Sequence, residues 1–146
     1  MDLKEALMKS MAEVCSLYGM TPQFQQETEG SLMATDQVNV MISFGPNPKG
    51  KITFGFNLTR ALKIAAAMLG EEVESFNLKA RTILSEFATF NTSLAIGKTA
   101  VFGAISFSAP IIITGTNVHA VISRLKAKQL VFQIEDDLML LTYCIE

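Results

Sequence analysis

Four polar residues recur along one helical segment at a spacing that would place their side chains on one face. Residues 77–99 have the apolar periodicity of an amphipathic helix, about 33 Å long. Within this segment, Thr82, Glu86, Thr89 and Ser93 follow one another at intervals of four, three and four residues. At about 100° per residue they lie in one narrow sector of the helix, here called the polar stripe. One carboxylate and three hydroxyls can donate and accept hydrogen bonds, yet composition alone favours a solvated helix face.

The other residues that could carry chemistry form no catalytic or metal-binding pattern. His119 is the single histidine and has no nucleophile or acid at a suggestive spacing, so a packed or surface histidine is favoured. The acidic sets at 71–74 and 135–137 lack the spacing of a calcium loop and are predicted to be solvated loop charge. Cys15 and Cys144 lie near opposite ends of the chain, which predicts two buried, reduced thiols and no metal site.

Composition limits the class of protein. The chain has 146 residues, which predicts one domain over residues 1–146 with a sizeable core. Its net charge of −2 and its lack of a basic run argue against nucleic acid and against an anionic membrane surface as partners. The sequence contains neither the pattern of a signal peptide nor an apolar run of about 20 residues, so we expect a soluble, cytoplasmic protein.

Several elements are expected before the long helix. Residues 3–18 have an apolar stripe and end at Gly19, which predicts a first helix. Residues 38–44 and 52–56 alternate with period two on either side of a proline- and glycine-rich turn, which predicts a hairpin. A second helix is predicted over residues 61–69, capped by Asn57 or Thr59 and stopped by Gly70.

The remaining segments favour strands. Residues 23–30 are predicted to be a loop or a weak edge strand, and residues 117–127 are ambiguous between strand and helix. Other predicted strands are a short one at 31–34, one at 111–113, and a final hairpin formed by 131–134 and 138–145 around Asp136-Asp137. Helices segregated from antiparallel strands define an α+β fold.

Residues 50–115 carry a family resemblance. A glycine-led strand precedes a helix ending Ala66-Ala67-Met68-Leu69-Gly70, a short linker, and a helix with a Ser/Asp-x-x-x-Glu-x-x-Asn type of pattern. The later run Ala109-Pro110-Ile111-Ile112-Ile113-Thr114-Gly115 looks like a proline-led strand of the same family. On these features the chain resembles the CheC/CheX family of chemotaxis phosphatases, and CheX more closely. The resemblance implies a single-domain α+β fold with an antiparallel sheet, a long central helix and two further helices.

The resemblance also implies a role for the polar stripe in two-component signalling. It implies a CheY-like receiver domain of a response regulator as partner, and hydrolysis of the receiver's phospho-aspartate. Laid on this sequence, the family pattern becomes Thr82-x-x-x-Glu86-x-x-Thr89. The resemblance implies Glu86 and Thr89 as the catalytic residues, with Thr89 at the position that orients water. It also implies that Glu86 docks the receiver, together with Thr82 and Ser93 beside it. Mg²⁺ is expected on the receiver, so no cofactor is expected on this chain. The family's dimers, formed by strand exchange, imply a homodimer to which residues 138–145 could contribute.

Thr89 separates two hypotheses about activity. The family has Asn there, whose carboxamide offers two N–H donors and a carbonyl, whereas Thr89 offers one hydroxyl close to the helix axis. In a helix such a hydroxyl is often drawn back to the carbonyl four residues earlier, here that of Ser85. Asn91 lies about 200° away around the helix and is a poor replacement. The chain is therefore either a phosphatase with a weakened catalytic position or a binding module with little or no hydrolytic power, and the second is slightly favoured.

Overall fold

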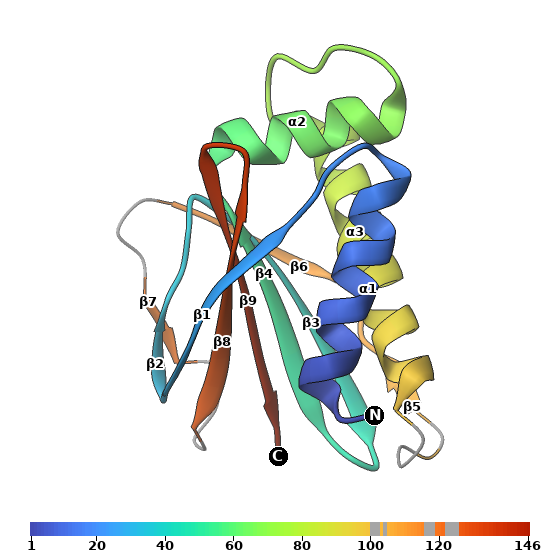
Figure 1. Cartoon of the computed structure of the whole chain (residues 1–146), viewed down its shortest axis with the longest axis vertical. Coiled ribbons are helices and arrows are strands. Elements are labelled where there is room, and N and C mark those ends of the chain that lie inside the picture. The colour runs from blue at the N-terminus through green and yellow to red at the C-terminus, as the bar shows by residue number, and fades with distance from the viewer. Residues whose placement is uncertain (100–102, 104, 116–118, 122–125) are drawn as a thin grey trace.

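Helices gather on one side of an antiparallel sheet, in the order that the sequence predicts (Figure 1). The structure, a computed structural model, describes residues 1–99, 103, 105–115, 119–121 and 126–146. The helices among them are α1 (Leu3–Leu17), α2 (Leu58–Leu69) and α3 (Leu78–Lys98). The strands are β1 (Gln23–Gly30), β2 (Leu32–Ala34), β3 (Val38–Pro46), β4 (Gly50–Phe56), β5 (Ile105–Phe107), β6 (Ile111–Thr114), β7 (His119–Val121), β8 (Ala127–Ile134) and β9 (Asp137–Ile145).

Seven of the strands form one antiparallel sheet. Its order is β1-β8-β9-β4-β3-β5, and β6 also pairs with β3. The predicted hairpins are both present, because β3 pairs with β4 and β8 pairs with β9. A separate two-stranded sheet joins β2 to β7. The α+β prediction is confirmed, as is a long helix accompanied by two further ones.

The structure settles the segments that the sequence left open. Residues 23–30 form β1, a strand at the edge of the sheet that pairs with β8. Residues 119–121 form a strand, while residues 116–118 and 122–125 lie outside the described part of the chain. The final turn falls at Glu135 and Asp136, one residue earlier than predicted, because Asp137 already pairs with Ile134. The short strand β5 was not predicted.

Helix ends follow the local sequence signals. The side chains of Asp2, Asn57 and Asn77 accept hydrogen bonds from the first turns of α1, α2 and α3 at 2.8, 2.7 and 2.9 Å. These bonds satisfy backbone donors that have no partner inside the helix. Gly70 ends α2 in the left-handed conformation, with a φ of 70°, which glycine adopts without steric cost.

One hydrophobic core lies between the helices and the sheet. α1 contributes residues such as Leu7 and Met11, and every second residue of the central strands points toward them, for example Ile52 and Phe54 of β4. Cys15 and Cys144 are both buried and free, as predicted. Burial raises the pKa of the Cys15 thiol to about 12, so it stays protonated at neutral pH.

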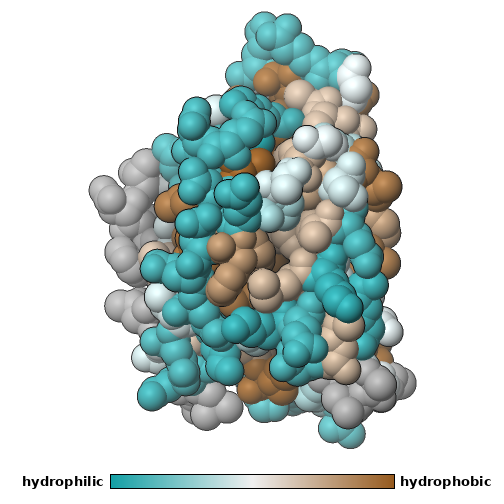
Figure 2. Space-filling view, in the orientation of Figure 1, coloured by the Kyte–Doolittle hydropathy of each residue, from teal (hydrophilic) through white to brown (hydrophobic). Residues whose placement is uncertain are grey.

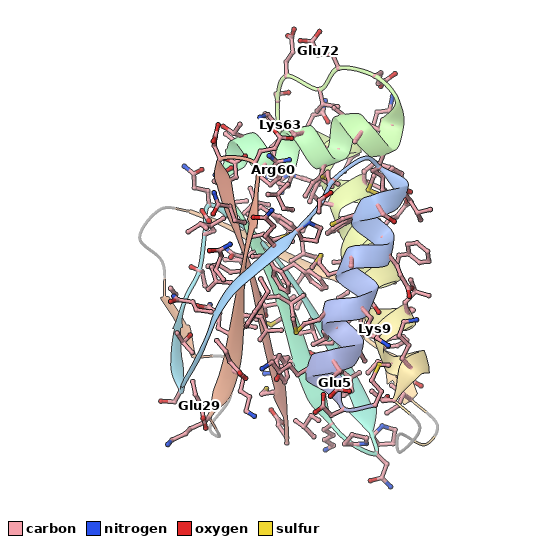
Figure 3. All side chains as sticks on the ribbon, viewed as in Figure 1. Glu5, Lys9, Glu29, Arg60, Lys63 and Glu72 are labelled. Carbon is pink, nitrogen blue, oxygen red and sulfur yellow. The ribbon has the colours of Figure 1, made fainter. Side chains whose placement is uncertain are left out.

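An ion pair beneath α2 corrects the prediction of solvated loop charge at Asp137, whereas Glu135 and Asp136 are exposed as predicted. Figure 3 shows Arg60 on α2 beside the β8–β9 turn, where its side chain is 1% exposed. Its Nη2 lies 2.8 Å from Oδ2 of Asp137, which is 13% exposed, and also donates to the carbonyl of Ile134 at 3.2 Å. The hydrogen bond from Asn57 and the guanidinium of Arg60 hold the pKa of Asp137 below its usual range. The turn and the start of α2 are thereby joined.

Replacing Asp137 by Ala should therefore be strongly destabilising, because it leaves the buried guanidinium of Arg60 with only the exposed carboxylate of Glu135, 3.8 Å away, as a counter-ion. We expect a loss of about 3 kcal/mol in the free energy of unfolding, measured by urea denaturation. Glu71→Ala is the control, since Glu71 pairs with Lys79 at the surface, where both side chains are more than half exposed. That change should cost less than about 1 kcal/mol. Equal losses in the two variants would contradict a structural role for the buried pair.

The two edges of the sheet differ in character. The edge strand β1 is exposed and rich in Gln and Glu, and the surface over it is largely hydrophilic (Figure 2). The opposite edge carries exposed apolar side chains, namely Phe107, Ile111 and Ile113. β9 lies inside the sheet, and its residues 139–143 pair with both β8 and β4, so this part of 138–145 offers no free backbone edge for exchange. No helix in the described part of the chain is long and apolar enough to span a membrane.

Candidate functional site

The rotation of α3 about its axis is set by aromatic packing. Phe87 is fully buried and meets Phe54 and Phe56 of β4 edge-to-face, with ring centroids 6.3 and 5.9 Å apart. Such pairs add stabilisation beyond the apolar area they bury. Residues on the same face as Phe87, such as Leu84 and Ala88, are also fully buried. The opposite face of the helix therefore points away from the core.

Neighbouring helices hold the two ends of α3. α1 packs along it, and Nζ of Lys98 in the last turn of α3 lies 3.1 Å from a carboxylate oxygen of Glu13. At the other end, the guanidinium of Arg81 lies over the ring of Phe76 in the α2–α3 connection, 5.2 Å from its centroid. α2 ends close to the start of α3, as the short connection predicts. The helix that carries the polar stripe is thus supported along its length.

The polar stripe lines one open surface hollow, here called the α3 hollow. Its volume is about 480 Å³. Thr82, Glu86 and Ser93 are exposed and Thr89 is half-buried. The structure therefore brings together all four residues that the sequence singled out. The lining residues are Thr82, Ser85, Glu86, Thr89, Phe90, Ser93 and Pro110.

The polar side chains of the hollow differ in whether they have a hydrogen-bond or ion-pair partner within the protein. The hydroxyl of Thr82 donates to the backbone carbonyl of Leu78 at 3.0 Å, so it is partly committed to its own helix. The hydroxyl of Thr89 forms no hydrogen bond with the described residues, and the expected bond to Ser85 is not among those observed. Within the same part of the chain, the carboxylate of Glu86 has neither an ion pair nor a hydrogen bond. Glu86 and Thr89 are thus available to a partner.

Asn91 lies on the buried face of α3, as its angular position predicts. Its side chain is 1% exposed, and Nδ2 donates to the carbonyl of Phe87 at 2.9 Å. Its Oδ1 is buried and has no hydrogen-bond partner among the described residues. The helix is regular across this region, with no π-turn to rotate Asn91 outward. Asn91 therefore does not line the hollow.

Substitutions at Asn91 test this placement. Asn91→Leu keeps the branched shape and removes an unpaired buried carbonyl, so the free energy of unfolding should change by less than about 1 kcal/mol. Asn91→Asp places a carboxylate in the same environment and should cost about 2 kcal/mol or more. Urea denaturation of both variants measures the difference. A larger loss for Asn91→Leu than for Asn91→Asp would mean that the side chain is not buried as described.

Three lining residues, Ser85, Phe90 and Pro110, were not predicted to be parts of a site. Phe90 is an apolar residue of the helix, yet it is 41% exposed. Pro110 was identified only as the start of a strand, and its approach to α3 is a tertiary contact that no local pattern signals. The backbone of His119 is in β7, and its side chain is not among those described. The described residues contain no group of three or more His, Cys, Asp or Glu side chains that could hold a metal ion.

Comparison with solved structures identifies the fold. A chemotaxis protein CheX from Desulfovibrio desulfuricans superposes with a TM-score of 0.83 at 16% identity, covering 100% of both chains. A CheC-like superfamily protein from a Shewanella species covers 100% of this chain and 99% of its own, with a TM-score of 0.85 at 21% identity. The CheX of a CheX–CheY–BeF3–Mg²⁺ complex from Borrelia burgdorferi covers 99% of this chain and 98% of its own, with a TM-score of 0.80 at 16% identity.

The chain therefore has the CheC/CheX fold, and several of the structures that it matches are CheX proteins. The fold expected from the resemblance in residues 50–115 is confirmed. No model of a known protein family matches the sequence, and a search of curated proteins found no significant relative. At these low identities the superpositions establish the architecture, while the function of the hollow depends on its own chemistry.

Proposed function

We propose that this chain is a CheX-like protein that docks the phosphorylated receiver domain of a CheY-like response regulator through α3. The observation that carries the proposal is the α3 hollow, where the polar stripe is gathered and where Glu86 and Thr89 have no side-chain partner among the described residues. A protein of the same fold was solved in complex with CheY, BeF3 and Mg²⁺, which supports a receiver domain as the class of partner. The pathway that this implies is chemotaxis or another two-component circuit.

Glu86 is the docking residue in this proposal. Its carboxylate is exposed on a rigid helix and has no counter-ion among the described residues, so a lysine or arginine of the partner can pair with it. Thr82 and Ser93 flank it on the same face and offer hydroxyls to the partner's polar groups. No metal ligand is required of this chain, because the Mg²⁺ is expected in the receiver.

Docking is favoured over efficient hydrolysis because of Thr89. Removal of a phosphoryl group from aspartate by water needs a group that holds the water in line with the phosphorus. A carboxamide can accept from the water through its carbonyl oxygen while its N–H group donates to a phosphoryl oxygen. A hydroxyl must do both through one oxygen, with a single proton and a shorter reach. The alternative is a phosphatase of low turnover in which the hydroxyl of Thr89 performs part of that task.

Binding to an activated receiver tests the docking role. CheY-like receivers from the source organism, activated with beryllofluoride and Mg²⁺, serve as probes in a titration calorimetry experiment. Glu86→Ala should weaken binding about tenfold or more at low salt, because it removes one side of a charge pair, and the effect should shrink as salt rises.

Glu72→Ala is the matched control for this measurement. Glu72 is also an exposed glutamate; it projects from the α2–α3 connection (Figure 3) and does not line the α3 hollow. Glu72→Ala makes the same change in net charge as Glu86→Ala. Because Glu72 lies outside the hollow, the control should bind as the wild type does. If the two variants weaken binding equally, the effect is one of net charge and the docking role of Glu86 is wrong. If the wild type binds no activated receiver, the proposed function is wrong.

Hydrolysis of a phosphorylated receiver separates docking alone from catalysis. Thr89→Asn should raise the rate of dephosphorylation about 100- to 1000-fold over wild type, the range that one placed hydrogen-bonding group contributes in comparable sites. Thr89→Val, which keeps the shape but lacks the hydroxyl, is the control and should remain inactive. Robust wild-type turnover that is lost in Glu86→Ala would instead favour the phosphatase. No gain in Thr89→Asn would mean that this position does not face the phosphoryl group.

A further inference from the structure

The α3 hollow has an apolar wall in addition to its polar stripe. Phe90 follows Thr89 on α3, and Pro110, which precedes β6, comes from a different part of the chain. Neither residue can donate a hydrogen bond from its side chain or carry a charge. The wall can therefore offer a partner only apolar contact, which is separate from the polar contacts of Glu86 and Thr89.

The exposed ring of Phe90 lacks the aromatic and cation contacts that another exposed ring, that of Phe24, makes within the described residues. Its side chain is 41% exposed, close to the 40% of Phe24 on β1. The ring of Phe24, however, packs edge-to-face on Phe132 and lies under the ammonium of Lys4. Phe90 has no ring or cation contact of these kinds with the described residues. An aromatic ring left open beside a hollow is the kind of side chain that is enriched at the centres of protein interfaces.

The charges of the hollow limit what can fill it. Glu86 is the only charged residue of its lining, and no lysine, arginine or histidine is found among the described lining residues. A second copy placed with its hollow on this one would bring two glutamates together in a site that excludes water, which is unfavourable. The complementary occupant is a surface that presents a cation to Glu86 and an apolar side chain beside it.

We infer that the wall formed by Phe90 and Pro110 determines specificity for the receiver, by taking an apolar side chain that lies next to the cation bound by Glu86. This inference rests on the proposed function and extends it. The charge pair orients the partner, while the apolar contact supplies most of the discrimination between receivers, because only a partner with both groups in register can bury Phe90.

Calorimetric titration of beryllofluoride-activated receivers against variants of the full chain tests the inference. Phe90→Ser should weaken binding about tenfold or more, whereas Phe90→Leu, which keeps an apolar side chain, should stay within about threefold of wild type. Leu17→Ser is the matched control, because Leu17 is a 66% exposed apolar residue at the end of α1, outside the lining of the hollow. Circular dichroism and urea denaturation of each variant check that the fold is retained.

The outcomes distinguish this inference from the proposed function. Wild-type binding that survives Phe90→Ser but is lost in Glu86→Ala would overturn the apolar wall as a determinant and leave docking intact. Absence of binding by the wild type would overturn both. Sedimentation analysis of the free chain adds a third result, since a dimer that dissociates in Phe90→Ser but not in Leu17→Ser would mean that a second copy covers the wall. Loss of affinity confined to Phe90→Ser, with Phe90→Leu retained, supports the inference.

Discussion

The packing of α3 against β4 is the constraint on which the functional surface depends. Phe87 is enclosed by Phe54 and Phe56, and the interior of a protein is too densely packed for such a ring to move without displacing its neighbours. A turn of the helix by one residue, about 100°, would carry Phe87 out of its site and Glu86 toward the core. Burial of that carboxylate without a partner would be costly. The same contact thus keeps the aromatic ring inside and the polar stripe outside.

The surroundings of α3 add rigidity at both ends. The buried pair of Arg60 and Asp137 joins the start of α2 to the β8–β9 turn, and α2 in turn leads directly into α3. At the other end, α1 packs along α3 and pairs with its last turn. A site on a supported helix keeps its side chains at fixed separations, which is what a docking surface needs in order to discriminate between partners.

In the proposed function, the α3 hollow recognises a partner more than it catalyses a reaction. An unpaired carboxylate, hydroxyls and an exposed aromatic ring can bind a charged and partly apolar surface. The position that would orient water holds a threonine, and the nearby carboxamide of Asn91 is committed to the interior. The two functional hypotheses share the proposed docking role of Glu86 and differ in whether the hydroxyl of Thr89 can orient water.

The sequence by itself determined the order of the three helices and the two hairpins, and the face of α3 on which the stripe would lie. These are local properties, set by periodicities of 2 and about 3.6 residues and by residues such as Asn77 and Gly70 that end helices. It also placed Glu86, Thr89 and Asn91 correctly on their two sides of α3, since angle follows directly from spacing. No local pattern predicted the order of the strands within the sheet, the strand β5 or the ion pair between Asp137 and Arg60.

Only the tertiary structure decided that the stripe is the floor of a hollow with an apolar wall. Phe90 belongs to the apolar periodicity of α3, yet it is exposed because the neighbouring elements do not extend over it. Pro110 reaches the same hollow from a segment 20 residues further along the chain, brought there by the pairing of β6 with β3. Burial is decided by which surfaces meet, and contacts between distant segments depend on the whole topology. The spacing of residues therefore predicts the face of a helix but not what covers it.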